Sequence, residues 1–166
     1  MKKLFPPFLF SIFYFAVCLQ AQDTYKSYCN NRFTFCVNYP ANLVNPQPES
    51  TNGDGCEMRA KQGKAKVTTW GNYAPTYAIE GTSDFDRKAE VKKVFEDAMV
   101  GKTITYKVLK DTWFVLSGTD KEGNIFYHKS MFQDLAFITV LIEYPKAEKA
   151  TWDKQCGKIS NSLKFN

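Results

Sequence analysis

The chain is poor in the residues on which many enzyme and metal sites depend. Its 166 residues include a single histidine, His128, and neither a CxxC pair nor a GxSxG motif. A structural zinc site needs four Cys or His ligands at short spacings, and a nucleophile-elbow hydrolase needs a serine flanked by glycines. These absences argue against a zinc centre and against a hydrolase of that type.

A run of apolar residues long enough to cross a membrane is also missing, although the first 21 residues have the organisation of a secretory signal peptide. Two lysines precede an apolar stretch from Phe8 to Leu19, and Ala21 supplies the small side chain preferred at the cleavage site. The stretch is shorter than the roughly 20 residues of a spanning helix. Lipid anchoring at Cys18 is disfavoured because Val17 is larger than the residue that normally precedes a lipoprotein cysteine. We therefore expect cleavage after Ala21, export to the periplasm or beyond, and no transmembrane segment afterwards.

Long runs of like charge are absent as well. Lys and Arg are interleaved with Asp and Glu through most of the chain, and the formal net charge is +5. Removal of residues 1–21 leaves 20 basic and 17 acidic side chains, a net charge of +3. This pattern is typical of an ordinary solvated surface, so we expect no nucleic-acid partner. Residues 22–166 contain no repeat or low-complexity linker and are expected to form a single domain.

Four cysteines would remain after cleavage: Cys29, Cys36, Cys56 and Cys156. An even number of cysteines in an exported chain predicts two disulfides, for which three pairings are possible. We favour Cys36 with Cys56 and Cys29 with Cys156, because the strands expected to carry Cys36 and Cys56 are close in sequence.

Alternating apolar and polar residues predict a strand over Arg32–Tyr39, with Phe33, Phe35 and Val37 on its buried side. Residues 22–31 are expected to be irregular, and residues 41–55 are expected to form a loop. Its Asn52–Gly55 run has oxygen-bearing side chains but lacks the further ligands and closing acid of a calcium loop. We interpret the run as a tight turn.

The remaining pattern predicts an antiparallel sheet packed by helices. A hairpin is expected over Cys56–Lys61 and Ala65–Tyr73, then a helix capped by Ser83 and stopped at Gly101. A four-strand meander follows at Thr103–Leu109, Trp113–Thr119, Asn124–Phe132 and Ala136–Tyr144, and a second main helix of about 15 residues comes after Pro145. The predicted fold class is α+β, an antiparallel β-sheet of about six to seven strands sandwiched with two main helices.

Several of these segments together resemble small exported bacterial proteins of the PsbP-like superfamily, such as the DcrB-type periplasmic proteins. The segments are Arg32–Pro40, Asn52–Gly55, Trp113–Gly118, Gly123–Lys129 and Tyr144–Pro145. They are strand and turn elements, so the resemblance implies a PsbP-like fold more than an activity. Members of the superfamily mostly bind or assist other macromolecules. The signal peptide argues against the role of its cytosolic effector chaperones, and no residues match the manganese-related function of its photosynthetic member.

The function expected is that of a non-enzymatic accessory or binding protein, without a cofactor, whose partner is a protein or glycan of the envelope or extracellular space. Trp70, Tyr73 and Tyr77 are the candidate partner-binding aromatics, because they lie where a strand gives way to a loop. No catalytic or metal-ligating residue is assigned.

Two alternatives stay open. His128 is the one candidate general base, and an exported hydrolase could in principle combine it with Ser117, Ser130 and Asp134. A structural role for this histidine within a strand is the simpler interpretation. The second alternative is a carrier that holds a small ligand on the face of the sheet.

Overall fold

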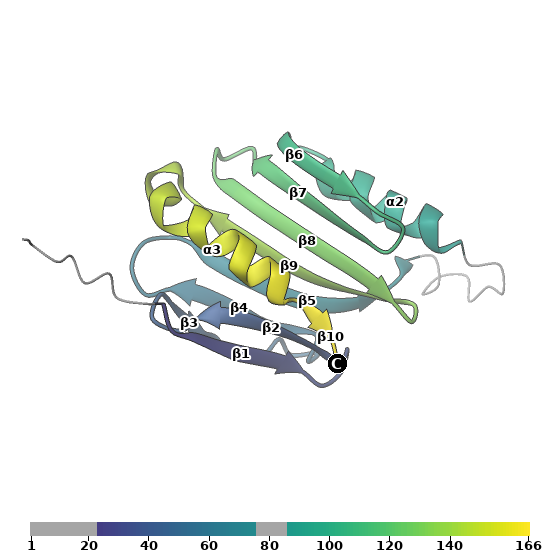
Figure 1. The fold of residues 1–166 in the computed structure, drawn as a ribbon, viewed down its shortest axis with the longest axis horizontal. Coiled ribbons are helices and arrows are strands. Elements are labelled where there is room, and N and C mark those ends of the chain that lie inside the picture. The colour runs from purple at the N-terminus through teal and green to yellow at the C-terminus, as the bar shows by residue number, and fades with distance from the viewer. Residues whose placement is uncertain (1–22, 76–85) are drawn as a thin grey trace, which may run out of the picture.

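The protein is an α+β sandwich in which two antiparallel sheets and two main helices pack in layers (Figure 1). The structure is a computed structural model that describes residues 23–75 and 86–166. Its elements are β1 (Tyr25–Asn30), β2 (Phe35–Pro40), β3 (Val44–Pro46), β4 (Gly55–Ala60), β5 (Lys66–Tyr73), α2 (Arg87–Met99), β6 (Thr103–Leu109), β7 (Trp113–Thr119), β8 (Ile125–Gln133), β9 (Ala136–Tyr144), the short 3₁₀ helix η1 (Lys146–Glu148), α3 (Lys149–Ser162) and β10 (Lys164–Phe165).

The larger sheet has seven strands in the order β3-β4-β5-β9-β8-β7-β6, and the smaller has three in the order β1-β2-β10. All strand pairs are antiparallel. The predicted meander is confirmed as β6 to β9, and the predicted hairpin β4–β5 joins it where β5 pairs with β9. The predicted fold class is therefore confirmed.

The two faces of the larger sheet are buried in different ways. One face carries Phe114, Leu116, Phe126 and Phe137 and packs against Val91 and Phe95 of α2. The opposite face carries Val67, Ile138, Val140 and Ile142, and packs against Phe35 and Val37 of β2 and against Trp152 and Ile159 of α3. Strand β9 lies between the two cores, which explains why its sequence is apolar almost throughout.

Two strands lie where the sequence predicted none. Residues 25–30 form β1 instead of an irregular segment, and Val44–Pro46 of the predicted loop pair with β4 as β3. Neither segment alternates strongly between apolar and polar residues, so their pairing partners, rather than their own side chains, hold them in strands.

The first main helix begins later than the predicted cap. Ser83 lies outside the described residues, and the carboxylate of Asp86 accepts hydrogen bonds from the backbone N–H groups of Lys88 and Ala89. Gly101 follows the helix with a φ of 73°, as expected of a residue that ends a helix in the left-handed region.

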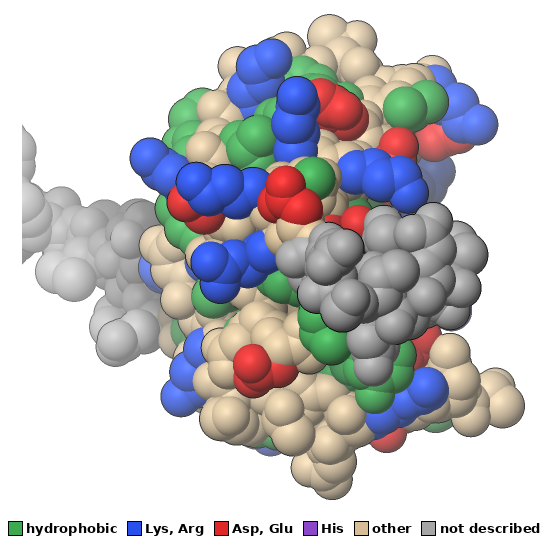
Figure 2. All heavy atoms as spheres, turned by 90° about the vertical axis from the view of Figure 1, so that its right-hand side faces the viewer, with side chains coloured by type: hydrophobic (Ala, Val, Ile, Leu, Met, Phe, Trp, Pro, Cys, Tyr) green, Lys and Arg blue, Asp and Glu red, His purple; other side chains and the backbone are tan. Residues whose placement is uncertain are grey.

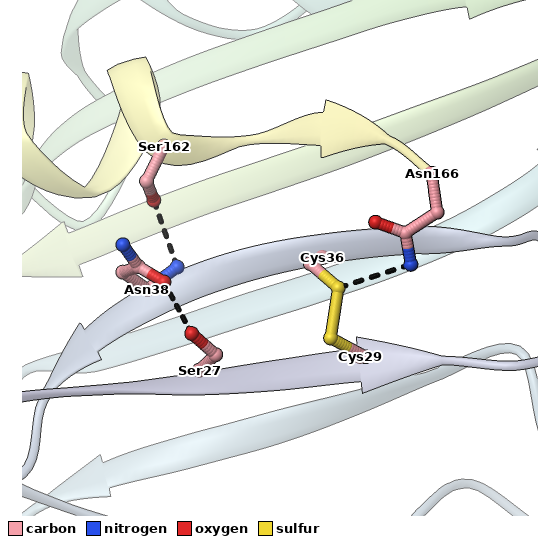
Figure 3. The surroundings of a disulfide bond; sticks show 6 residues. All are labelled: Ser27, Cys29, Cys36, Asn38, Ser162 and Asn166. Carbon is pink, nitrogen blue, oxygen red and sulfur yellow. Dashed lines mark hydrogen bonds between the residues drawn. A yellow bond between two sulfur atoms is a disulfide. The ribbon is translucent and has the colours of Figure 1, made fainter.

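One disulfide is present in the described residues, and it joins Cys29 of β1 to Cys36 of β2 (Figure 3). The favoured pairings of Cys36 with Cys56 and of Cys29 with Cys156 are wrong. The error follows from the missed β1 strand, because the β1–β2 register places Cys29 directly opposite Cys36. Cys56 lies in the other sheet and Cys156 in α3, and both are buried free thiols.

Loss of the disulfide is expected to destabilise the protein moderately. Because the bridge spans a sequence separation of 7 residues, replacing Cys29 and Cys36 by serine should lower the free energy of unfolding by about 2 kcal/mol. Denaturant unfolding of the double variant and of the parent protein measures this difference. A reducing agent should destabilise the parent but leave the double variant unchanged. A cross-linked proteolytic fragment containing Cys56 or Cys156 would contradict the assignment.

Candidate functional site

The candidate site is a groove of about 550 Å³ between α3 and the part of the sheet that α3 leaves uncovered. Its residues include Ser117, Ile125, Tyr127 and Tyr144 from strands β7 to β9, and Lys149, Asp153, Cys156 and Gly157 from α3. Thr105 of β6 and Lys146 of η1 also line it. We call this hollow the α3 groove.

The α3 groove exists because α3 lies obliquely over the sheet and packs mainly on β2, β8 and β9 (Figure 1). Trp152, Cys156 and Ile159 recur at steps of three or four residues and hold one side of the helix in the core. The next positions, Asp153 and Gly157, therefore border the groove. A Cβ atom added at Gly157 would have no heavy atom within 4 Å, which shows that this stretch of the wall is open.

A small hydrogen-bonded network fixes the charged end of the α3 groove. The hydroxyl of Tyr144 donates to Asp153 Oδ1 at 2.8 Å, and Lys149 Nζ donates to Asp153 Oδ2. Desolvation alone would raise the pKa of Asp153, but the hydrogen bonds from Lys149 and Tyr144 outweigh it and hold that pKa below its ordinary value. The carboxylate is thus ionised and neutralised, while Lys146 forms no ion pair with any described residue. The lining is slightly cationic as a result.

The thiol of Cys156 lies beside this network without being activated by it. Burial raises the pKa of Cys156 to about 11, although a hydrogen-bond contact with the Tyr144 hydroxyl, at 3.6 Å, acts in the opposite direction. A thiol with this pKa is almost entirely protonated at neutral pH and is a poor nucleophile. Cys156 therefore presents a neutral thiol to the α3 groove near pH 7.

A larger hollow of about 870 Å³ lies between the start of α2 and the β8–β9 turn. Its wall includes Asp86, which directly follows residues 76–85, and those residues lie outside the described part of the chain. The α3 groove is the better-defined site because its lining lies within residues 105–157, away from that segment.

His128 is buried on the α2 side of the sheet with 7% of its surface exposed. Its Nε2 atom lies 3.0 Å from the Ser130 hydroxyl, which in turn lies 2.7 Å from the Thr139 hydroxyl. Nδ1 has no hydrogen-bond partner in the structure, so no described carboxylate orients the ring. Desolvation, reinforced by the positive charge of Lys102, lowers the pKa of His128 to about 3, and the ring is neutral near pH 7.

The other members of the possible hydrolase site are not gathered around His128. Ser117 belongs to the α3 groove on the opposite face of the sheet, and its hydroxyl donates to the carbonyl of Phe126. Asp134 lies in the β8–β9 turn, where its carboxylate accepts a hydrogen bond from Gln133. Of the three partners considered, only Ser130 is near the histidine.

The candidate aromatics do not form one patch within the described residues. Trp70 is half-buried on the α2 side of β5, with its ring centroid 6.2 Å from that of His128. Tyr73 is 51% exposed and packs edge-on against Phe33 on the opposite face, at 5.3 Å. Tyr77 lies outside the described residues.

The α3 groove was not foreseen from the sequence, because it depends on how α3 crosses the sheet. An isolated glycine inside the helix, Gly157, was its one sequence signal.

Among residues 23–75 and 86–166, no group of three or more His, Cys, Asp or Glu side chains is arranged to hold a metal ion. No helix in the same residues is both long and apolar enough to cross a bilayer.

Comparison with known proteins supports the fold. No protein-family model matches the chain, and no curated protein matches its sequence. Among solved structures, the chain is similar to the solution structure of cyanobacterial PsbP (CyanoP) from Synechocystis sp. PCC 6803. The superposition has a TM-score of 0.55 at 9% sequence identity and covers 89% of this chain and 95% of that one. The PsbP-like fold is therefore confirmed, and at this identity the similarity concerns the fold alone.

Protonation of His128 is expected to destabilise the folded protein. The unfolded chain binds a proton at this residue near pH 6.5, whereas the folded chain does so only near pH 3. Because the unfolded state binds more protons in that window, stability should fall as the pH falls from 6.5 to about 3. The slope should approach ~1.4 kcal/mol per pH unit.

His128→Gln, which cannot titrate, should lack this slope. Denaturant unfolding of both proteins between pH 6.5 and 5 separates the effect from that of the carboxyl groups, which titrate at lower pH. Parallel stability curves over this range would contradict the burial of a neutral His128.

Proposed function

We propose that this protein is a non-enzymatic accessory module that binds a segment of another protein in the α3 groove. The observation that carries the proposal is the lining of that groove, in which the aromatic rings of Tyr127 and Tyr144 lie beside two lysines. Aromatic side chains supply contact area at interfaces, and lysines attract carboxylates. The expected ligand segment has an apolar or aromatic side chain next to Asp or Glu.

The chemistry of the candidate nucleophiles supports binding over catalysis. The Cys156 thiol has a raised pKa, and the Ser117 hydroxyl is engaged by a backbone carbonyl. Ser130 is buried, with 1% of its surface exposed, and its hydroxyl lies 2.7 Å from that of Thr139. A nucleophile needs an adjacent base and access to its substrate, and these groups lack that combination.

We also propose that the protein works outside the cytoplasm, as a member of the exported DcrB-type group within the PsbP-like fold. The signal-peptide pattern of residues 1–21 supports export, and the Cys29–Cys36 disulfide is of the kind that persists in oxidising compartments.

Filling the α3 groove should abolish ligand binding without unfolding the protein. Gly157→Trp places a large ring in the open wall, whereas Gly157→Ala adds only a methyl group and should raise the free energy of unfolding by about 0.5–1 kcal/mol. The probe is a phage-displayed library of random peptides, selected against the protein purified from cells that express the full chain. We expect the selected peptides to bind Gly157→Trp at least about tenfold more weakly than Gly157→Ala.

Charge reversal of a lysine in η1 and of one in α3 provides a second comparison. Lys146→Glu should weaken the selected peptides because Lys146 lines the groove, and Lys154→Glu should not because Lys154 lies outside it. If the selected peptides bind all four variants with the same affinity as the parent, the α3 groove is not their binding site. If the parent protein binds a glycan on an array and Gly157→Trp does not, the ligand of the α3 groove is a carbohydrate and not a protein segment.

Export has a direct mass-spectrometric test. The protein recovered from the envelope or medium should begin at Gln22, as expected after cleavage following Ala21. Recovery of the uncleaved chain from the cytoplasm would contradict export while leaving the groove proposal untouched.

A further inference from the structure

Strand β6 forms a free edge of the seven-stranded sheet. It pairs with β7 on one side, and no strand of the described residues lies on its other side (Figure 1). Five of its seven residues are exposed. An edge strand of this length presents unpaired backbone groups to which another chain can add.

The hydrogen-bonding alternation identifies which backbone groups are free. The N–H of Lys110 donates to the carbonyl of Trp113 at 2.9 Å. Hydrogen-bonded positions alternate along an antiparallel strand, so Val108 and Tyr106 bond to β7 while Lys107 and Leu109 direct their N–H and C=O groups outward. A bulge between Ile104 and Tyr106 interrupts the register and limits a regular added strand to the second half of β6.

Strand β6 exposes two large hydrophobic side chains, Tyr106 and Leu109. Among the described residues, four large hydrophobic side chains are exposed, and three of them are Val100, Tyr106 and Leu109. Their exposed fractions are 76%, 53% and 40%. Tyr106 and Leu109 belong to β6 and lie on opposite faces of the sheet, whereas Val100 is the C-cap of α2.

The charge of the edge selects the partner. Residues 100–110 contain Lys102, Lys107 and Lys110 and no Asp or Glu. Figure 2 views the end of the molecule whose upper part holds α2, and there lysine and arginine side chains are interleaved with aspartate and glutamate side chains around small hydrophobic groups. Lys102 Nζ already donates to the carbonyl of Ala98 at 2.9 Å, so an incoming strand with acidic side chains would neutralise Lys107 and Lys110.

A second copy of the chain fits this edge poorly. Over the regular half of β6, antiparallel pairing of two copies centred on Lys107 sets this lysine opposite itself, and pairing centred on Val108 sets Lys107 opposite Leu109. Like charges directly opposite one another on paired strands are destabilising. In either register the second copy adds the lysines of residues 106–110 and no carboxylate, so an acidic partner is favoured.

We propose that β6 accepts an extended, acidic segment of a partner protein as an eighth strand of the larger sheet. The segment hydrogen-bonds to the free backbone groups of Lys107 and Leu109. It packs apolar side chains beside Tyr106 on one face of the sheet and places carboxylates beside Lys107 on the other face. This surface is separate from the α3 groove and does not depend on ligand binding there.

The probe is a synthetic peptide in which valine alternates with glutamate, compared with a peptide in which lysine replaces glutamate. Binding is followed by backbone NMR shifts and by amide hydrogen exchange of the full protein. We expect the acidic peptide to shift the resonances of residues 103–110 and to slow exchange of the Lys107 and Leu109 amides. The lysine peptide should bind at least about tenfold more weakly.

Two variants test the mechanism. Lys107→Pro removes an outward N–H that β7 does not use, so the fold should persist while the acidic peptide loses at least about tenfold in affinity. Lys107→Thr retains the N–H and is the matched control, which should lose much less. The combined Lys107→Glu and Lys110→Glu variant should reverse the preference in favour of the lysine peptide.

Three outcomes would overturn the proposal. They are equal binding by Lys107→Pro and Lys107→Thr, no binding by either peptide, and dimerisation of the protein alone in sedimentation experiments that Lys107→Pro abolishes. The Gly157→Trp variant should bind the acidic peptide normally, so failure at the α3 groove and failure at β6 are distinguishable.

Discussion

The need to bury both faces of strand β9 governs the rest of the structure. Its apolar residues face α2 on one side and β2 with α3 on the other, so the larger sheet must be covered twice. The seven strands span about 29 Å at ~4.8 Å per neighbour. The layer opposite α2 consists of the three strands of the smaller sheet and α3, a helix of about 10 Å diameter, and it covers only about 20 Å of that width. Because the second layer is centred near β9, the strip left uncovered runs along β6 and β7, and it holds both the α3 groove and the free edge.

The polar groups inside the two cores stabilise the fold without forming a reactive site. His128 and Ser130 of β8 and Thr139 of β9 lie on the α2 side, where the Ser130 hydroxyl contacts both Nε2 of His128 and the Thr139 hydroxyl. Tyr144, Asp153 and Lys149 do the same where α3 meets the sheet. In each case burial favours the neutral form of a potentially reactive group, His128 in one and Cys156 in the other.

The elements that could be predicted are those whose own residues determine them. Strands β6, β7 and β9 have the expected bounds, because apolar periodicity and short turns define them locally. Strands β1 and β3 were missed because pairing with β2 and β4 stabilises them. The disulfide was assigned wrongly for the same reason, since only the β1–β2 register brings Cys29 to Cys36. The groove was beyond prediction because it depends on packing between segments distant in sequence.

The two proposed surfaces share a boundary, which matters for any partner that uses both. Thr105 belongs to β6 and also lines the α3 groove, at the bulge where the regular edge ends. A chain that leaves the added strand at this point has only a short path to Lys146 and Lys149. Tethering one segment at the edge raises the effective concentration of the next segment at the groove, so two weak contacts can act as one strong one. The uncovered strip thus supplies two adjoining cationic surfaces, and an acidic partner could occupy both without any change in the core.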